Sequence, residues 1–253
     1  MTAGVVKHAP PYPVPREPVL LGFWRFLRNP APQVAYDPRP WRTLTALLAL
    51  FVSIAIITVF AVVLPIESAI EAPESLLEDE DSLGVLIALA LYAVLIAPPF
   101  EEVIFRLPLA EYQPALPLIG GIMAVVFLAG LAEVPVGLVL SLGGILTVYA
   151  LLMLVAGGAG LSMRLLPQMG PIWRQHFRWV VYGTSVVFGL IHIANWAWES
   201  YGLVEVAVMP LMTLPQLAGG FVLAYARVRL GLTHAILLHG AYNALVVPLV
   251  FLV

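Results

Sequence analysis

The chain has 253 residues, of which 61% are hydrophobic and 11% are charged, and its formal net charge is −3 at neutral pH. Apolar residues occur in runs of about twenty, the length needed to cross a bilayer, so the composition predicts a polytopic membrane protein. The small net charge gives no basis for a nucleic-acid partner. Cysteine is absent, which excludes disulfides, thiolate nucleophiles and cysteine-ligated zinc.

Residues 1–43 are rich in proline and lack the apolar core of a cleaved signal peptide, so we expect a cytoplasmic N-terminal tail. Within this tail, Leu20–Leu27 (LLGFWRFL) fits either a short amphipathic helix on the membrane surface or a loosely ordered segment. Residues 44–253 contain no evident internal repeat or soluble domain. We therefore expect them to form one transmembrane domain.

The apolar windows of that domain predict an all-α, polytopic transmembrane helical bundle of about seven spans. Each window is close to the length that about 30 Å of hydrocarbon requires. The windows cover residues 44–66, 84–100, 117–132, 135–157, 179–196, 203–225 and 232–253.

The distribution of charge predicts the orientation of this bundle. The loop Glu67–Asp81 holds seven acids and no base, whereas six bases precede the first span. By the positive-inside rule, the N-terminus is cytoplasmic. Two later groups of arginines agree with an N-in arrangement of seven spans: Arg164, Arg174 and Arg178 between the fourth and fifth, and Arg227 and Arg229 between the sixth and seventh.

Prolines interrupt the helical pattern between residues 98 and 117, and they flank two adjacent acids in APPFEEVIFRLPL (residues 97–109). Irregular backbone at membrane depth is tolerated where it lines a cavity inside the protein. We therefore expect a broken or re-entrant segment near residues 98–117. It would carry Glu101 and Glu102.

Ionisable groups inside a span are costly and normally face the bundle interior, so these two glutamates are candidates for function. Residues four apart share a helix face, so Glu102 can pair with Arg106, whereas Glu101 lies on another face without an obvious partner. Glu101 is therefore the better candidate for a base. The alternative is a purely structural salt-bridge cluster that fixes helix packing.

Two further polar stripes point toward the same interior. Phe188, His192 and Asn195 share one face of the fifth window, and His239 and Asn243 lie four apart on the last one. Together with an unpaired glutamate, they predict one polar cavity. Of the other polar candidates, Glu205 and His234 are expected at the membrane interface. His8 and His176 are expected in exposed segments. The sequence has no HExxH, GxSxG or Walker motif.

The ordered motifs EEVIFR (101–106), FGLIH (188–192) and HGAYN (239–243) resemble the EExxxR, FxxxH and HxxxN pattern of the CPBP family of intramembrane proteases. That family includes the eukaryotic type II CAAX prenyl endopeptidase and bacterial Abi-type relatives linked to bacteriocin processing and self-immunity. The resemblance covers roughly residues 84–250. Each motif alone is weak evidence, but three in order on separate apolar segments are specific.

The resemblance implies a role for each motif residue. Glu101 and His192 would activate a water molecule, His239 and Asn243 would stabilise the oxyanion, and Glu102 and Arg106 would support them. Members of the family are often described as metalloproteases, and Glu101, His192 and His239 could in principle hold Zn²⁺. We favour a metal-free glutamate mechanism, because an asparagine is a poor zinc ligand but a good oxyanion donor.

These features predict an intramembrane endopeptidase that cleaves a peptide or membrane-associated protein, in the inner (plasma) membrane of a bacterium. Its partners would be that substrate and the lipid bilayer. A proton-linked transporter is the alternative class, since intramembrane Glu and His residues also form proton relays. A third interpretation is a non-catalytic membrane immunity or scaffold protein that uses the motifs only for binding.

Overall fold

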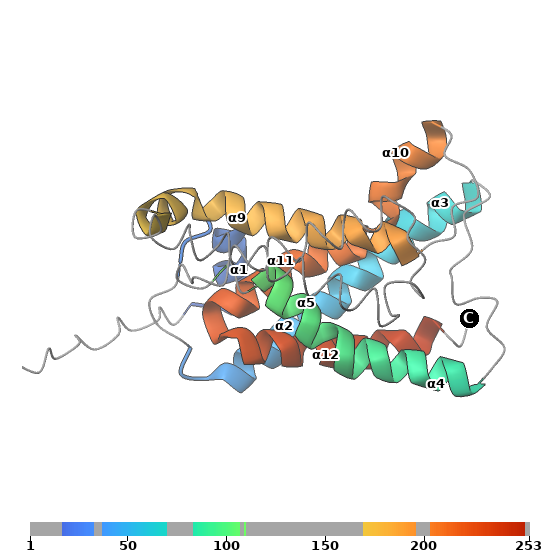
Figure 1. Ribbon diagram of the computed structural model, residues 1–253, viewed down its shortest axis with the longest axis horizontal. Coiled ribbons are helices and arrows are strands. Elements are labelled where there is room, and N and C mark those ends of the chain that lie inside the picture. Colours follow the sequence, from blue (N-terminus) through green and yellow to red (C-terminus); the bar gives the residue numbers. More distant parts are fainter. Residues whose placement is uncertain are drawn as a thin grey trace, which may run out of the picture.

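The computed structural model describes residues 17–32, 37–69, 83–106, 109, 169–195 and 203–250. Every regular element within these ranges is a helix, in agreement with the predicted all-α class (Figure 1). The predicted spans at 117–132 and 135–157 lie outside the described residues.

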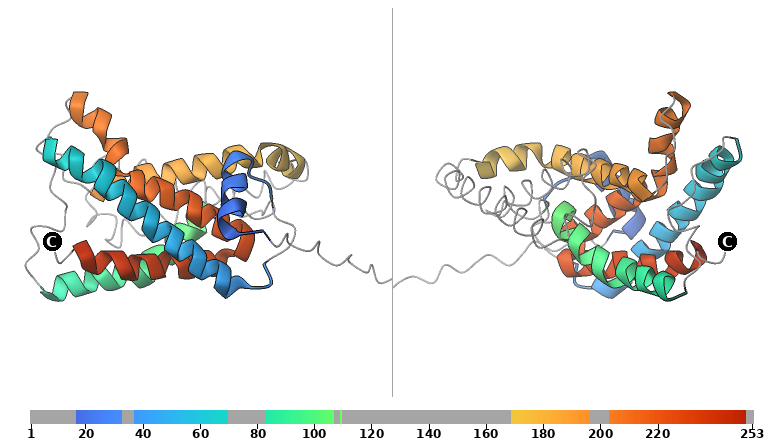
Figure 2. Two further views of the ribbon diagram at one scale, coloured as in Figure 1. Left: turned by 180° about the vertical axis from the view of Figure 1, so that it is seen from behind. Right: turned by 45° about the vertical axis from the view of Figure 1, so that its right-hand side comes forward.

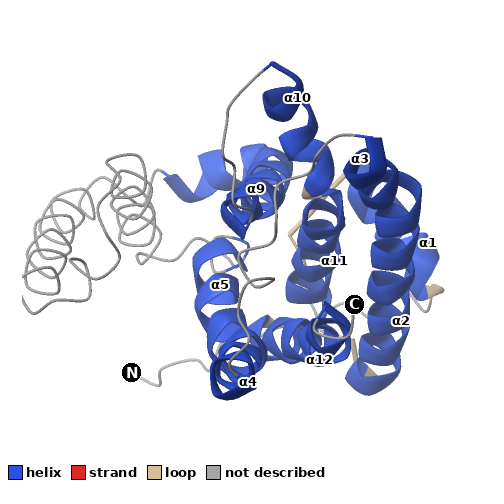
Figure 3. Cartoon of the chain, turned by 90° about the vertical axis from the view of Figure 1, so that its right-hand side faces the viewer, coloured by secondary structure: helices blue, strands red, loops and turns tan. Residues whose placement is uncertain are grey.

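Helix α11 (Leu214–Leu230) is the centre of the bundle. It packs against α9 (Met169–Ile191), α2 (Pro40–Thr58) and α12 (Leu232–Val250). In the view along the longest axis of the molecule, α11 lies among these three helices (Figure 3). Its buried face is contiguous over the last three turns because close neighbours cover it on several sides. The apolar core of the protein is therefore organised around one helix near the C-terminal end of the chain.

Small residues allow these helices to approach closely. A Cβ atom on Gly189 of α9 would lie 2.6 Å from the Cα of Leu217 in α11, which real structures do not tolerate. Ser185 of α9 donates a hydrogen bond to the carbonyl oxygen of Gly220, 3.3 Å away. Glycine at such contacts is typical of helix pairs in membranes, where packing rather than water drives association.

Two continuous helical stretches are long and apolar enough to cross a membrane, namely Pro40–Ala69 and Gly84–Arg106. The first comprises α2, a π-helical turn η1 (Val59–Val63) and α3 (Leu64–Ala69). Large apolar side chains on its outer surface, including Ile57 and Phe60, are more than 60% exposed. Such a surface is compatible with lipid rather than water.

The second stretch carries the acidic motif. It runs through α4 (Leu83–Leu91), the π-helical turn η2 (Tyr92–Ile96) and α5 (Ala97–Arg106) without a break. The prediction of a broken helix is wrong for the described part of residues 98–117, since both prolines at its start lie inside α5. The π-helical turn explains how the prolines are accommodated, because it already shifts the backbone hydrogen-bond register ahead of them.

The predicted span at 203–225 is also wrong as a single element. It consists of α10 (Leu203–Met212) and α11, separated at Thr213, and the two helices point in different directions (Figures 1 and 2). Pro215 has no N–H and its ring opposes the carbonyl group four residues earlier, so a helix begins rather than continues there. Helix α11 then extends five residues beyond the predicted end.

The segment Leu20–Leu27 belongs to a helix, α1 (Val19–Arg28), which decides between the two structures that the sequence allowed. One face of α1 packs on α11, where Phe23 and Phe26 contact the ring of Tyr225. The N-terminal region therefore contributes to the folded bundle from residue 17 onward, rather than forming only a tail.

Candidate active site

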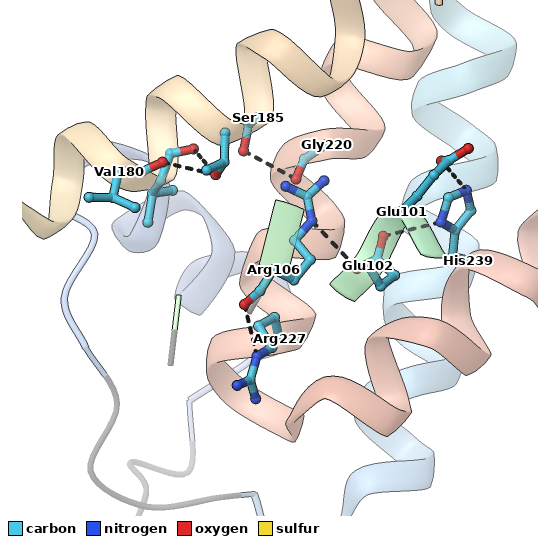
Figure 4. Close-up of polar contacts among 10 residues, drawn as sticks. Glu101, Glu102, Arg106, Val180, Ser185, Gly220, Arg227 and His239 are labelled. Atoms are coloured by element: carbon cyan, nitrogen blue, oxygen red, sulfur yellow. Dashed lines mark hydrogen bonds and ion pairs between the residues drawn. The ribbon is translucent and has the colours of Figure 1, made fainter. Parts of the chain in front are cut away.

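Three helices bring the predicted motif residues together. Helix α5 carries Glu101, Glu102 and Arg106, and α12 carries His239 (Figure 4). Helix α9 carries Phe188, and the 3-10 turn that follows it, η5 (His192–Asn195), carries His192. Helices α5 and α12 are in direct contact, as are α5 and α9. Residues far apart in the sequence thus meet inside the apolar bundle.

Glu102 is fully buried between two partners. Its Oε2 atom lies 3.5 Å from Nε of Arg106, which is the pair predicted from helical spacing. Its Oε1 atom lies 3.1 Å from Nδ1 of His239, a contact that the sequence did not predict. A carboxylate removed from water is stable only when such groups compensate its charge. Glu102 therefore organises the centre of the site.

Glu101 differs from its neighbour in exposure and in partners. Its side chain is 26% exposed, whereas that of Glu102 is 0% exposed. Its Oε2 atom lies 3.8 Å from Nε2 of His239, so the predicted solitary glutamate faces a histidine across a gap longer than a hydrogen bond. Within the described part of the chain, this oxygen is buried and accepts no hydrogen bond. It is available to a water molecule or a substrate.

Phe188 is the common contact of the site. Its ring lies 4.9 Å from the ring of His192 and 5.8 Å from that of His239, and the guanidinium carbon of Arg106 lies 4.8 Å from its centroid. Phe105 meets the same ring edge-on at 5.4 Å. This aromatic residue of the FxxxH motif thus fixes both histidines and contributes a cation–π contact to a buried arginine.

The hydrogen bond of His192 defines the state of its ring. Nδ1 lies 2.7 Å from the carbonyl oxygen of Phe188, four residues earlier. A carbonyl oxygen only accepts hydrogen bonds, so Nδ1 carries the proton and donates it. In the neutral ring, Nε2 is then the acceptor. A backbone hydrogen bond that selects the tautomer in this way is a common means of orienting a functional histidine.

Asn243 is held by the irregular part of the acidic helix. Its Nδ2 donates to the carbonyl oxygen of Ala93, 2.7 Å away in η2. In the i→i+5 register of a π-helix, this carbonyl would pair with the N–H of Pro98, which proline lacks. The proline therefore leaves an acceptor free for Asn243. The amide nitrogen has two hydrogens, and this bond uses one.

Gly240 permits the same helices to meet. A Cβ atom at this position would lie 3.0 Å from the carbonyl oxygen of Val94, the next residue of η2. That carbonyl would likewise find no donor in the π-helical register, because Pro99 lies five residues later. The two prolines and the glycine of HGAYN together produce the close contact between α12 and η2 that positions His239 and Asn243.

Arg227 was not predicted to belong to the site. Its position in the sequence indicated a cytoplasmic loop, but the side chain is 8% exposed and lies in the last turn of α11. Its Nε donates to the carbonyl oxygen of Arg106, 3.1 Å away, at the end of α5 (Figure 4). A cation at a helix C-terminus satisfies an orphan carbonyl and favours the helix dipole. No pattern along the sequence indicated this contact.

The zinc alternative required Glu101, His192 and His239 to gather around one point. Among the described residues, no group of three or more His, Asp or Glu side chains is arranged to hold a metal ion.

The side chains of two further candidates, Asn195 and Glu205, lie outside the described residues. His234, expected at the interface, lies at the start of α12 beside the exposed Trp41.

Comparison with known proteins identifies one family. Residues 83–245, more than half of the chain, match the family described as "Type II CAAX prenyl endopeptidase Rce1-like". The matched range includes all three motifs and every residue of the site described above. No curated protein and no solved structure matches the chain.

Proposed function

This chain belongs to the Rce1-like family of type II CAAX prenyl endopeptidases, and from this membership we propose a glutamate-dependent intramembrane endopeptidase. The observation that carries the mechanism is the convergence of Glu101, Glu102 and His239 in an apolar bundle, with Oε2 of the partly exposed Glu101 accepting no hydrogen bond in the described residues. The family implies a membrane protease, and the roles below are our proposal for its residues.

Glu101 is the proposed general base. It takes one proton from a water molecule while the water oxygen attacks the scissile carbonyl carbon. The partial exposure of the Glu101 side chain and the absence of a hydrogen bond to its Oε2 atom in the described residues support this role. Glu102 is fully buried, with one oxygen 3.5 Å from Arg106 and the other 3.1 Å from His239. His192 assists by accepting a hydrogen bond from the same water at Nε2, consistent with its Nδ1–H being donated to Phe188.

His239 and Asn243 are the proposed donors to the oxyanion of the tetrahedral intermediate. Asn243 has one amide hydrogen beyond the bond to Ala93. His239 already donates from Nδ1 to Glu102, so donation from Nε2 requires the doubly protonated ring. When the intermediate collapses, the C–N bond breaks and the proton held by Glu101 passes to the amine that leaves.

We propose that the reaction needs no metal ion. Support comes from the site itself, because Glu102 already occupies Nδ1 of His239 and no three His, Asp or Glu side chains of the described residues are arranged to hold a metal ion. Dialysis against a strong chelator is therefore expected to leave cleavage unchanged. Loss of cleavage, with recovery on adding Zn²⁺, would replace this mechanism by the metal-dependent alternative.

The proposed substrate is a peptide or membrane-associated protein, and the proposed location is a bacterial inner membrane with the N-terminus in the cytoplasm. The basic residues before Pro40 and the seven acids among residues 67–81 support this orientation. Labelling of single cysteines introduced at each end of the Pro40–Ala69 span, in intact cells, tests it. The opposite labelling pattern would reverse the topology.

Cleavage is tested on membranes that contain the unmodified protein, Glu101→Gln or His192→Ala at equal abundance. Mass spectrometry of newly formed peptide termini is expected to find products with the unmodified protein that both variants lack. Gly183→Ala provides a matched control, since a Cβ atom there meets nothing within 4 Å. Equal products from all four proteins would refute the proposed catalytic roles.

A further inference from the structure

The outer face of α1 is apolar although it has no partner within the described part of the chain. Leu20, Leu21 and Trp24 are 61%, 42% and 52% exposed, while Phe23 and Phe26 on the opposite face are buried against α11. Residues 20, 24 and 28 share one side of a helix. A short helix with one face on the protein and a second apolar face outward is suited to the interfacial region of a bilayer.

The position of α1 on the bundle is fixed. The hydroxyl of Tyr182 in α9 donates to the carbonyl oxygen of Leu27, 2.8 Å away. Gly22 leaves no room for a side chain, because a Cβ atom would lie 2.3 Å from the hydroxyl of Tyr225. The outer face of α1 is therefore presented in a defined orientation at one end of the bundle, beside the start of α9 (Figure 2).

We call this end of the bundle the basic end. It carries exposed arginines on α1, α2 and α9 and in the segment between α1 and α2. Its two described acids are both engaged, since Glu17 lies 2.7 Å from Arg25 and Asp37 lies 3.1 Å from Arg229. The helices α1, α2 and α9 contain no acid. The exposed arginines are Arg25, Arg28, Arg39, Arg42, Arg174 and Arg178.

Tryptophans accompany these arginines. The guanidinium carbon of Arg28 lies 4.8 Å from the ring centroid of Trp24, and that of Arg178 lies 5.1 Å from Trp179. A third exposed tryptophan, Trp41, stands in the first turn of the membrane-spanning helix α2. Exposed tryptophans beside arginines are typical of the level at which lipid headgroups meet the hydrocarbon region.

We propose that the outer face of α1 docks onto an anionic phospholipid surface, with its apolar side chains among the acyl chains and the arginines of the basic end on lipid phosphates. Charge complementarity supports anionic lipid, because this end of the protein offers arginine without free acid. The neighbouring span favours a bilayer rather than a protein as the partner of α1. Its exposed Trp41, at the start of α2, indicates that α1 lies at the depth of the lipid headgroups. This inference is independent of the proposed catalytic mechanism.

The absence of cysteine from the chain allows a direct measurement of depth. A nitroxide label is attached to Leu20→Cys in the full chain, reconstituted in nanodiscs of phosphatidylcholine with phosphatidylglycerol. Its accessibility to oxygen and to a water-soluble nickel complex is compared with labels at Asn29→Cys and Ile57→Cys. Asn29 is exposed at the end of α1, and Ile57 is exposed in the middle of a span.

The label at residue 20 is expected to be several-fold more accessible to oxygen than to the nickel complex, as at residue 57, while the label at residue 29 shows the reverse. A label at residue 20 that resembles residue 29 would overturn the proposal. It would indicate that the face is in water and available to a protein.

Charge preference is measured separately on the unlabelled chain. Native mass spectrometry after incubation with equal amounts of phosphatidylglycerol and phosphatidylcholine is expected to find mainly the anionic lipid retained. Arg28→Gln combined with Arg42→Gln should abolish this preference, and neither substitution removes a described ion pair. Equal retention of both lipids by the unmodified chain would overturn the anionic part of the proposal.

Discussion

Two buried arginines, each paired with an acid, occupy opposite situations in this protein. Arg229 at the basic end lies 3.1 Å from Asp37 and donates to the hydroxyl of Tyr225 at 2.6 Å. Arg106 lies deeper, 3.5 Å from Glu102, and in the described residues neither of its terminal nitrogens has a hydrogen-bond partner. The first cluster is satisfied and joins the residue segment just before α2 to the end of α11. The second remains incompletely satisfied, which indicates a site that chemistry rather than stability has shaped.

The largest expected difference is that a substitution in the cluster around Arg106 lowers activity, whereas a substitution in the cluster around Arg229 lowers stability. Glu101→Gln should reduce cleavage by about 10²–10⁴-fold, because the proposed general base is lost, and leave the unfolding midpoint unchanged. Asp37→Asn should do the opposite, since it weakens the bonds to Thr43 and Arg229 far from the motif residues. Cleavage and denaturant unfolding are measured on both variants. Loss of cleavage in Asp37→Asn would abolish the distinction.

Removing the arginine from each cluster should separate them in stability. Arg106→Met leaves Glu102 fully buried with only His239 beside it, and breaking a buried pair in this way costs about 3–5 kcal/mol. The corresponding Arg229→Met should cost less, because water can reach its acid partners, Glu17 and Asp37, at the edge of the bundle. Unfolding in detergent with increasing dodecyl sulfate measures both. Combining Arg106→Met with Glu102→Gln should recover part of the loss, whereas no recovery would indicate that packing rather than charge dominates.

Close helix packing around the proposed catalytic cluster should be equally sensitive to side-chain volume. Gly189→Ala would place a Cβ atom against the backbone of Leu217 and separate α9 from α11, at a cost of about 1–3 kcal/mol. Because Phe188 precedes this glycine, cleavage should also fall. Gly183→Ala on the same helix meets open space and should be neutral or slightly stabilising. Similar unfolding midpoints for the two variants would contradict the tight packing inferred at the site.

Much of the site was predictable from local spacing. The pair of Glu102 with Arg106 and the bond from His192 to the carbonyl of Phe188 both span four residues, the interval that one helix face fixes. The contact of His239 with Glu102 spans 137 residues and depends on how α12 packs against α5, which no periodicity encodes. Sequence patterns therefore predicted contacts within one helix, but not contacts between helices such as that of Arg227 with the carbonyl group of Arg106.

Proline caused the main errors about the fold. A proline pair at residues 98 and 99 suggested a break, but η2 shifts the hydrogen-bond register before it and the helix continues. Another pair, at residues 210 and 215, lies within an apolar window that suggested one span, although two helices meet there. Proline is thus compatible with a continuous helix in one place and with the end of a helix in another. The difference depends on whether neighbouring helices provide hydrogen-bond donors for the carbonyl groups that proline leaves unpaired.

The smallest expected effect concerns pH and the satisfied cluster alone. Burial by itself would raise the pKa of Asp37, but hydrogen bonds from the N–H of Arg39 and from Thr43 and Arg229 outweigh it, so the pKa lies below its ordinary value of 3.8. A carboxyl group with a lowered pKa in the folded state stabilises the fold above the unfolded-state pKa, and this contribution is lost as the pH falls through the folded value. Protonation should therefore loosen the contact of the start of α2 with α11 at acidic pH by about 1–2 kcal/mol, toward the lower end for a hydrogen bond to a charged group. Hydrogen exchange of the amides in the first turns of α2 between pH 3 and 6, corrected for the intrinsic rate, should show less protection at the acidic end in the unmodified chain. Asp37→Asn should lack this pH dependence and show lower protection throughout, whereas the same pH dependence in both proteins would assign the effect to another group.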